Sequence, residues 1–145
     1  MKVSQTAIDL IKEFESFSAE AYTCPAGKLT IGYGHVVQKN EDYLNTKTLT
    51  EAEALQILTN DLKESEAYLN HICLEYDVEL TQNQFDALCS FCFNLGSFTN
   101  AMLERFKAKD LTAIGNSLIL YNKANGKELE GLTRRRKAEQ KLFFS

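Results

Sequence analysis

The chain has 145 residues, of which 44% are hydrophobic, so it is long enough for one domain with a buried core. Its net charge of −4 gives no basic surface of the kind that nucleic-acid binding requires. A single proline and seven glycines, without repeats or low-complexity tracts, argue against linkers between several domains. The composition therefore indicates one domain that does not bind nucleic acid, and we expect a monomer.

The first fifteen residues, MKVSQTAIDLIKEFE, carry a basic Lys2 but no continuous apolar run behind it. This pattern is typical of neither a secretory signal nor a membrane anchor. We therefore expect a soluble protein that is cytoplasmic when synthesised. Four cysteines in such a compartment are expected to be free thiols rather than disulfides.

The N-terminal third predicts a helix followed by a small sheet. Thr6 and Asp9 form a cap pattern, and apolar residues recur behind them at helical spacing. This pattern fades at Glu15, which is expected at or just past the helix end. The sequence CPAG at 24–27 predicts a tight turn, and KLTIGYGHVV at 28–37 is rich in strand-forming residues. Together they predict a small antiparallel hairpin or meander.

The rest of the chain is predicted to be helical. Thr50 with Glu53 and Thr81 with Gln84 are capping boxes, and other caps and glycines bound the remaining helices. Five helices are expected, at about 50–72, 81–96, 99–108, 111–123 (capped by Asp110 and closed near Gly126) and 133–143. The sequence thus predicts the α+β class, with a helix, a small sheet and then a helical bundle.

The stretch from Glu15 to His35 combines a carboxylate at a helix end, a tight turn, and glycines within a strand. Gly32 and Gly34 indicate a bulge, or a place where another group approaches the backbone closely. The G-x-G spacing does not open a helix, so a dinucleotide site is not indicated.

Three blocks of the chain resemble the phage lysozymes of glycoside hydrolase family 24. They are AYTCPAGKLTIGYGH at 21–35, QNQFDALCSFCFNLG at 82–96 and GLTRRRKAEQKLF at 131–143. The resemblance implies a single lysozyme-like domain over 1–145, with a sheet lobe, a helical lobe and an active-site cleft between them. The lobes are expected at about 15–45 for the sheet, and at 1–14 with 46–145 for the helices. The implied activity is hydrolysis of the β-1,4 bond between N-acetylmuramic acid and N-acetylglucosamine in peptidoglycan, without a cofactor or metal.

The resemblance assigns catalysis to three residues. Glu15 falls at the family's catalytic glutamate, whose implied role is to protonate the leaving glycosidic oxygen. Cys24 stands where many family members have an aspartate. It is either a nucleophile or electrostatic partner, a weak hydrogen-bonding neighbour, or a small buried turn residue. Thr30 is expected to position a water opposite the leaving group.

Three further residues are expected to support the site or bind substrate. His35 resembles a histidine that follows the strand in the family, and a structural or positioning role is implied rather than proton transfer. Tyr33 either packs against a sugar ring or belongs to the core. Asn94, an amide in the second block, is a candidate partner of sugar N-acetyl groups.

Residues 134–137 (Arg-Arg-Arg-Lys) form a basic block. If a helix starts at Thr133, these charges lie in its first turn, where the helix dipole disfavours cations. Residues placed against a local preference of the helix often have a functional role, so this position of the four cations favours a function for them. We expect Arg134 or Arg135 to pair with Glu15 and orient it, and the others to meet carboxylates of the substrate. The alternative is an ordinary solvated basic face.

Other functions remain as alternatives. Cys89 and Cys92 form a C-x-x-C near His71 and Cys73, as in some metal or redox proteins, but their core positions on an amphipathic helix favour buried thiols. A catalytically impaired wall-binding homologue, marked by Cys24, and an antibacterial effector would share the fold. Release from the cytoplasm through a pore-forming holin is implied by the resemblance alone.

Overall fold

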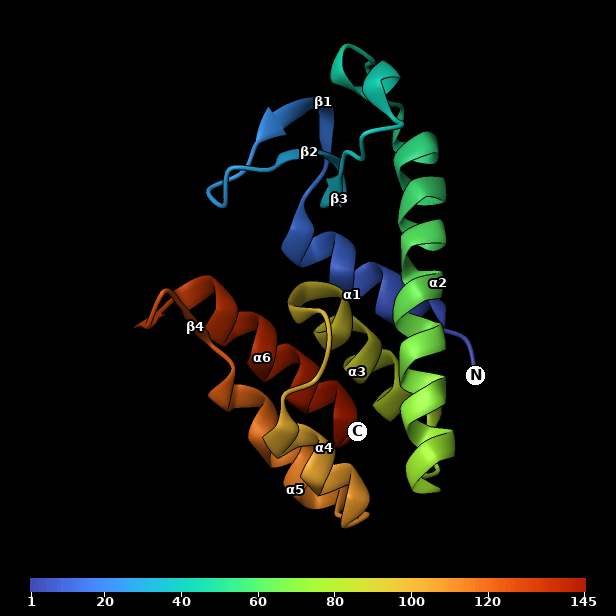
Figure 1. Cartoon of the computed structure of the whole chain (residues 1–145), viewed down its shortest axis with the longest axis vertical. Helices are drawn as coiled ribbons and strands as arrows, with labels where there is room; N and C mark the ends of the chain where they lie inside the picture. The colour runs from blue at the N-terminus through green and yellow to red at the C-terminus, as the bar shows by residue number, and fades with distance from the viewer. The chain divides into compact units, whose positions relative to one another are not determined.

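The computed structural model describes all residues from Met1 to Ser145 and divides into two compact units. The sheet unit consists of Ile11–Lys63, and the helical unit of Met1–Leu10 with Glu64–Ser145. Helix α1 (Gln5–Glu15) and the long helix α2 (Glu51–Tyr76) each contribute residues to both units (Figure 1).

The sheet unit contains three antiparallel strands in the order β1-β2-β3, which confirms the predicted meander. They are β1 (Ser18–Thr23), β2 (Leu29–Gly32) and β3 (His35–Val36), and the short 3-10 helix η1 (Asp42–Asn45) follows. In the predicted CPAG turn, Gly27 N donates to Cys24 O at 2.8 Å. The β1–β2 register shifts between Ser18 and Tyr22, so a bulge bends the strand that leads from Glu15 to Cys24.

Helix α1 ends at Glu15 as predicted, but its cap differs from the prediction. Ser4 Oγ accepts from Thr6 N at 3.2 Å, so Ser4 caps the helix and the predicted Thr6–Asp9 cap is wrong. Ser4 is in turn held by Asp86, which accepts from Ser4 N at 2.9 Å and from the Ser4 hydroxyl. A partner 82 residues away selects this cap, and no local pattern could show it.

The helical unit holds most of the predicted helices close to their expected bounds. Both capping boxes form, and Thr99 and Asp110 cap their helices as predicted. The elements are α3 (Gln82–Leu95), α4 (Asn100–Lys107), α5 (Leu111–Ser117), the 3-10 helix η2 (Leu118–Leu120), β4 (Lys123–Ala124), β5 (Lys127–Glu128) and α6 (Glu130–Phe143). Helices α3 and α6 pack side by side around the apolar core (Figure 1).

Two predicted helix bounds are wrong. The helix expected over 111–123 ends at Ser117, and β4 and β5 pair as an antiparallel hairpin after η2. Asn125 and Gly126 both have positive φ in the hairpin turn, as the Asn-Gly dipeptide favours, so Gly126 does not close a helix. Helix α6 starts at Glu130 rather than Thr133. The basic block therefore lies beyond the first turn, and our argument from the helix dipole does not hold.

Candidate active site

The carboxyl group of Glu15 lies directly against the backbone of Gly34, in the turn between β2 and β3. A Cβ atom built on Gly34 would overlap Glu15 Oε2 and lie 2.9 Å from Glu15 Cδ. The expectation that another group approaches this glycine closely is thereby confirmed. Glu15 is held at a helix end beside a tight turn of the sheet, within the sheet unit.

Cys24 and Thr30 lie together beside the β1–β2 pairing. Backbone hydrogen bonding from Lys28 is the main cause that lowers the pKa of the Cys24 thiol, and the Thr30 hydroxyl adds to it. Thr30 itself is buried, and its Oγ1 donates to Lys28 O at 3.2 Å. Cys24 is a free, partly exposed cysteine. A partly exposed thiol with a lowered pKa has more of the reactive thiolate than an ordinary cysteine.

Tyr33 is a core residue of the sheet unit, with only 4% of its surface exposed. Its hydroxyl donates to Glu51 Oε1 at 2.9 Å, and Lys12 Nζ lies 5.7 Å from the centre of its ring. Burial raises the pKa of Tyr33 to about 12. These contacts favour the core alternative over stacking on a sugar.

His35 is held on both sides of its ring by carboxylates. Nδ1 lies 2.8 Å from Asp61 Oδ2, and Nε2 lies 2.9 Å from Glu41 Oε1. Hydrogen bonding to Asp61 is the largest cause that raises the pKa of His35 to about 9. The imidazolium therefore joins β3 to α2, as a positioning residue would.

The His35 ion pairs predict a pH-dependent stability. The folded pKa of about 9 exceeds the ordinary 6.5, so their stabilisation is complete below pH 6.5 and is lost as pH rises through 9. That difference corresponds to about 3 kcal/mol. Urea unfolding between pH 6 and 10 should show this decline, and His35→Asn should remove it. The control, His71→Asn, changes an exposed histidine and should keep the decline; an equal decline in His35→Asn would contradict the assignment.

The predicted residues of the helical unit lie on α3 and α6. Arg135 is 3% exposed, and its Nη2 donates to Ser90 O at 3.2 Å, whereas Arg134 is exposed. Asn94 Oδ1 is buried without a hydrogen-bond partner, which leaves an acceptor for a ligand. The expectation that Arg134 or Arg135 pairs with Glu15 stays a prediction.

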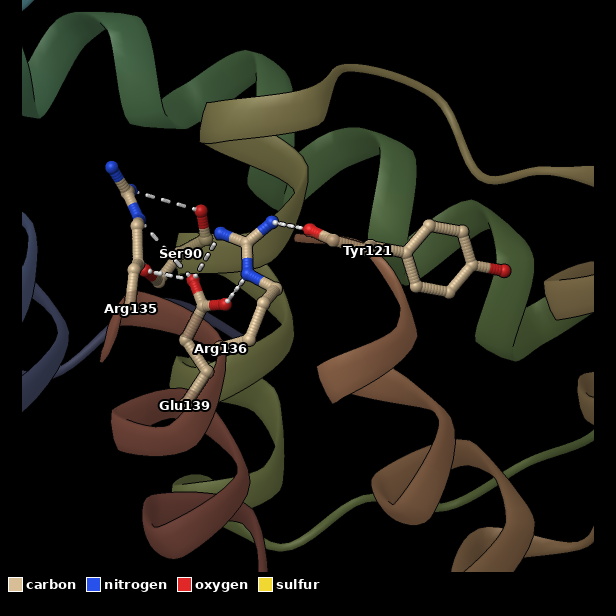
Figure 2. Close-up of polar contacts among 5 residues, drawn as sticks. All are labelled: Ser90, Tyr121, Arg135, Arg136 and Glu139. Atoms are coloured by element: carbon tan, nitrogen blue, oxygen red, sulfur yellow. Dashed lines mark hydrogen bonds and ion pairs between the residues drawn. The ribbon is translucent and has the colours of Figure 1, made fainter. Parts of the chain in front are cut away.

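The basic block contributes to a buried polar network that the sequence analysis missed (Figure 2). Arg136 Nε lies 2.7 Å from Glu139 Oε1, and both side chains are 0% exposed. Arg135 Nε lies 3.4 Å from Glu139 Oε2, and Ser90 Oγ donates to that oxygen at 2.6 Å. Arg136 Nη1 also donates to Tyr121 O at 3.5 Å.

This burial corrects two expectations for the block. Only Arg134 and Lys137 of the block are exposed, so the four residues do not form one solvated basic face, and the buried Arg136 is not available to carboxylates of a substrate. Arg135 and Arg136 precede Glu139 by four and three residues along a helix. This spacing could have indicated the ion pairs from the sequence.

The cysteines of the C-x-x-C motif are buried core residues. Burial raises the pKa of both Cys89 and Cys92, which disfavours the thiolate that metal binding and redox chemistry need. No group of three or more His, Cys, Asp or Glu side chains is arranged to hold a metal ion. No helix of the chain combines the length and the apolar character needed to span a membrane.

Gly34→Ala is expected to reduce the activity that the family resemblance implies for Glu15 about tenfold or more, since a small displacement of a reacting group is costly. The new methyl group must displace the Glu15 carboxyl, and φ of +76° adds backbone strain of about 1 kcal/mol. Gly126→Ala is the control, because its φ is +79° but nothing lies within 4 Å of its Cβ position. Rates and urea midpoints of both variants would be measured. Equal reaction rates in Gly34→Ala and Gly126→Ala would contradict the role of the contact between Glu15 and Gly34.

Comparison with known proteins identifies the family of the chain. The sequence model of the family described as Phage lysozyme matches residues 12–139. An endolysin of Acyrthosiphon pisum secondary endosymbiont phage 1 is 36% identical over 100% of this chain and 99% of its own length. The chain spans 55% and 56% of the longer endolysins of Bacillus phages B103 and PZA, with 34% and 37% identity.

Two solved structures share the fold. The muramidase domain of SpmX from Asticaccaulis excentricus has a TM-score of 0.82 and 33% identity, covering 99% of this chain and 98% of that one. A variant of P22 lysozyme has a TM-score of 0.80 and 31% identity, covering 100% of this chain and 99% of that one. With a family match over most of its length and these relatives, the chain belongs to the phage lysozyme family.

Proposed function

We propose that this chain hydrolyses the β-1,4 bond between N-acetylmuramic acid and N-acetylglucosamine in peptidoglycan, with Glu15 as the general acid. It is a glycoside hydrolase of the phage lysozyme family. The observation that carries the site is the Glu15 carboxyl set against Gly34, in the same unit as the paired Cys24 and Thr30.

In the proposed step, Glu15 donates its proton to the glycosidic oxygen as the bond from the sugar carbon to that oxygen breaks. Positive charge develops on the sugar ring as the bond breaks. A nucleophile neutralises this charge by attacking the ring from the face opposite the leaving oxygen. In one route a water held by Thr30 attacks the sugar carbon and releases its proton to bulk water. In the other the Cys24 thiolate attacks first, and water then displaces the thiolate from the adduct and gives its proton to the Glu15 carboxylate. The first route inverts the anomeric centre and the second retains it.

The test is the clearing of outer-membrane-permeabilised Gram-negative cells by the wild-type protein and by Glu15→Gln. The wild-type protein should clear the suspension and the variant should not. Proton NMR of the first product separates the two routes. The β-anomer of the new reducing end indicates retention, and the α-anomer indicates inversion, which the family resemblance favours.

We assign supporting roles at this site to an arginine of α6 and to Asn94. Arg135, or the exposed Arg134, orients Glu15 by an ion pair, and Asn94 Oδ1 accepts a hydrogen bond from a sugar N-acetyl group. Loss of substrate affinity in Asn94→Ala, with an unchanged turnover number, is the expected signature of a binding role.

The biological role proposed is lysis of the host by a phage. The relatives named endolysin favour this role over the antibacterial effector and the impaired wall-binding homologue. By this proposal the protein is a monomer, is made in the host cytoplasm, and reaches the wall after a holin opens the membrane. Co-expression with and without a holin would test that route, because lysis should require both proteins.

A further inference from the structure

A pocket of about 340 Å³, lined by both polar and apolar side chains, lies within the sheet unit, between η1, the loop after it and the first turns of α2. Its lining includes none of Glu15, Cys24 and Thr30, so it lies apart from the proposed catalytic residues, although His35 is one of its lining residues. The lining side chains that matter for its chemistry are His35, Tyr43, Lys47, Gln56, Ile57 and Asn60.

The charges of this η1–α2 pocket are already paired. His35 lies between Asp61 and Glu41, at 2.8 and 2.9 Å, and Lys47 Nζ lies 3.0 Å from Glu53 Oε2. Every cation of the lining therefore has a carboxylate partner, and an anionic ligand would have to break an ion pair to bind. This arrangement favours a neutral ligand that adds hydrogen bonds to paired groups.

Two other features of the lining point to a sugar. The amides of Gln56 and Asn60 are exposed on α2, and amides can both donate to and accept from hydroxyl and acetamido groups. The Tyr43 side chain lines the pocket while 63% of the residue stays exposed, so its ring offers an apolar face at the rim. The volume lies in the range of small-ligand sites.

We propose that the η1–α2 pocket binds an N-acetylated sugar unit of a glycan strand, as a second contact with the polymer that the site at Glu15 cleaves. This inference rests on the proposed function, since it takes its ligand from the same polymer. A second contact on one strand raises the affinity for long glycans without any change in the bond-cleaving groups. Turnover of short soluble oligosaccharides therefore stays unchanged when the pocket is altered.

The test measures binding without cleavage, as the binding of the Glu15→Gln protein to glycan strands that an amidase has freed from stem peptides and that are then immobilised on a surface. In that background, Tyr43→Ala and Asn60→Ala should weaken binding roughly threefold or more each, as loss of a contact or hydrogen bond predicts. Leu74→Ala and Lys63→Ala are the controls, because both residues are exposed on α2, the helix that carries Asn60, and neither lines the pocket. Unchanged binding in both pocket variants would overturn the proposal.

Two further outcomes separate this inference from the function itself. Binding to intact peptidoglycan but not to the stripped strands would overturn the glycan assignment and identify a stem peptide as the occupant. A wild-type protein that cleaves nothing would refute the proposed function, yet the binding assay on stripped strands would still report on the pocket. A lowered turnover of short oligosaccharides in Tyr43→Ala would also contradict the proposal, because it would link the pocket to catalysis.

Discussion

Replacing Glu15 by glutamine is expected to lower kcat/KM for peptidoglycan hydrolysis by about 10²-fold or more, the effect of removing general acid catalysis. Glutamine keeps the size and most of the shape of the side chain, so it should still fit against Gly34. It has no acidic proton to give to the leaving oxygen. Initial rates of cell-wall clearing, at matched protein concentrations, would measure the loss.

Glu13→Gln is the matched control, because Glu13 lies on the same helix two residues earlier and is exposed. Its rate should equal that of the wild-type protein. Urea midpoints of both variants should stay close to the wild-type value, which separates lost catalysis from lost folding. Equal clearing by Glu15→Gln and the wild-type protein would refute the assignment of Glu15.

Glu139→Gln is expected to destabilise the protein by about 3–5 kcal/mol, the usual result of breaking a buried ion pair from one side. Glu139 has no exposed surface, and it accepts contacts from Arg135, Arg136 and Ser90 (Figure 2). The neutral amide would leave the buried guanidinium group of Arg136 without the carboxylate that it contacts at 2.7 Å. Urea denaturation at pH 7 would measure the change.

The control for this prediction is Glu130→Gln, an exposed glutamate in the first turn of the same helix, which should cost under about 1 kcal/mol. A second variant distinguishes a lost ion pair from a simple packing defect. Arg136→Met combined with Glu139→Leu removes both members of the closest pair and should recover part of the stability. A loss below about 1 kcal/mol in Glu139→Gln would show that this network contributes little.

Local patterns in the sequence were sufficient for much of the fold. The capping boxes at Thr50 and Thr81 form as predicted, because each depends only on residues three positions apart. The CPAG turn and the three-stranded sheet follow from turn chemistry and strand-forming residues in one continuous stretch. Likewise, the position of Glu15 at a helix end followed from the loss of helical spacing after it.

The wrong end predicted for α5 also has a local cause. The Asn-Gly dipeptide at 125–126 favours a two-residue hairpin, whereas the sequence analysis interprets Gly126 as the end of a helix. Helix α6 starts at Glu130, three residues before the expected Thr133, so the arginines lie beyond its first turn.

By itself, then, the sequence determined the α+β class, the order of most elements, and the residue that ends the first helix beside a tight turn. Tertiary structure alone decided that Asp86 holds the cap at Ser4, that Tyr33 belongs to the core, and that Arg136 lies buried beside Glu139. The physical reason is that caps and turns depend on neighbours a few residues apart. Burial and the partner of a charged side chain depend instead on segments brought together only when the chain packs.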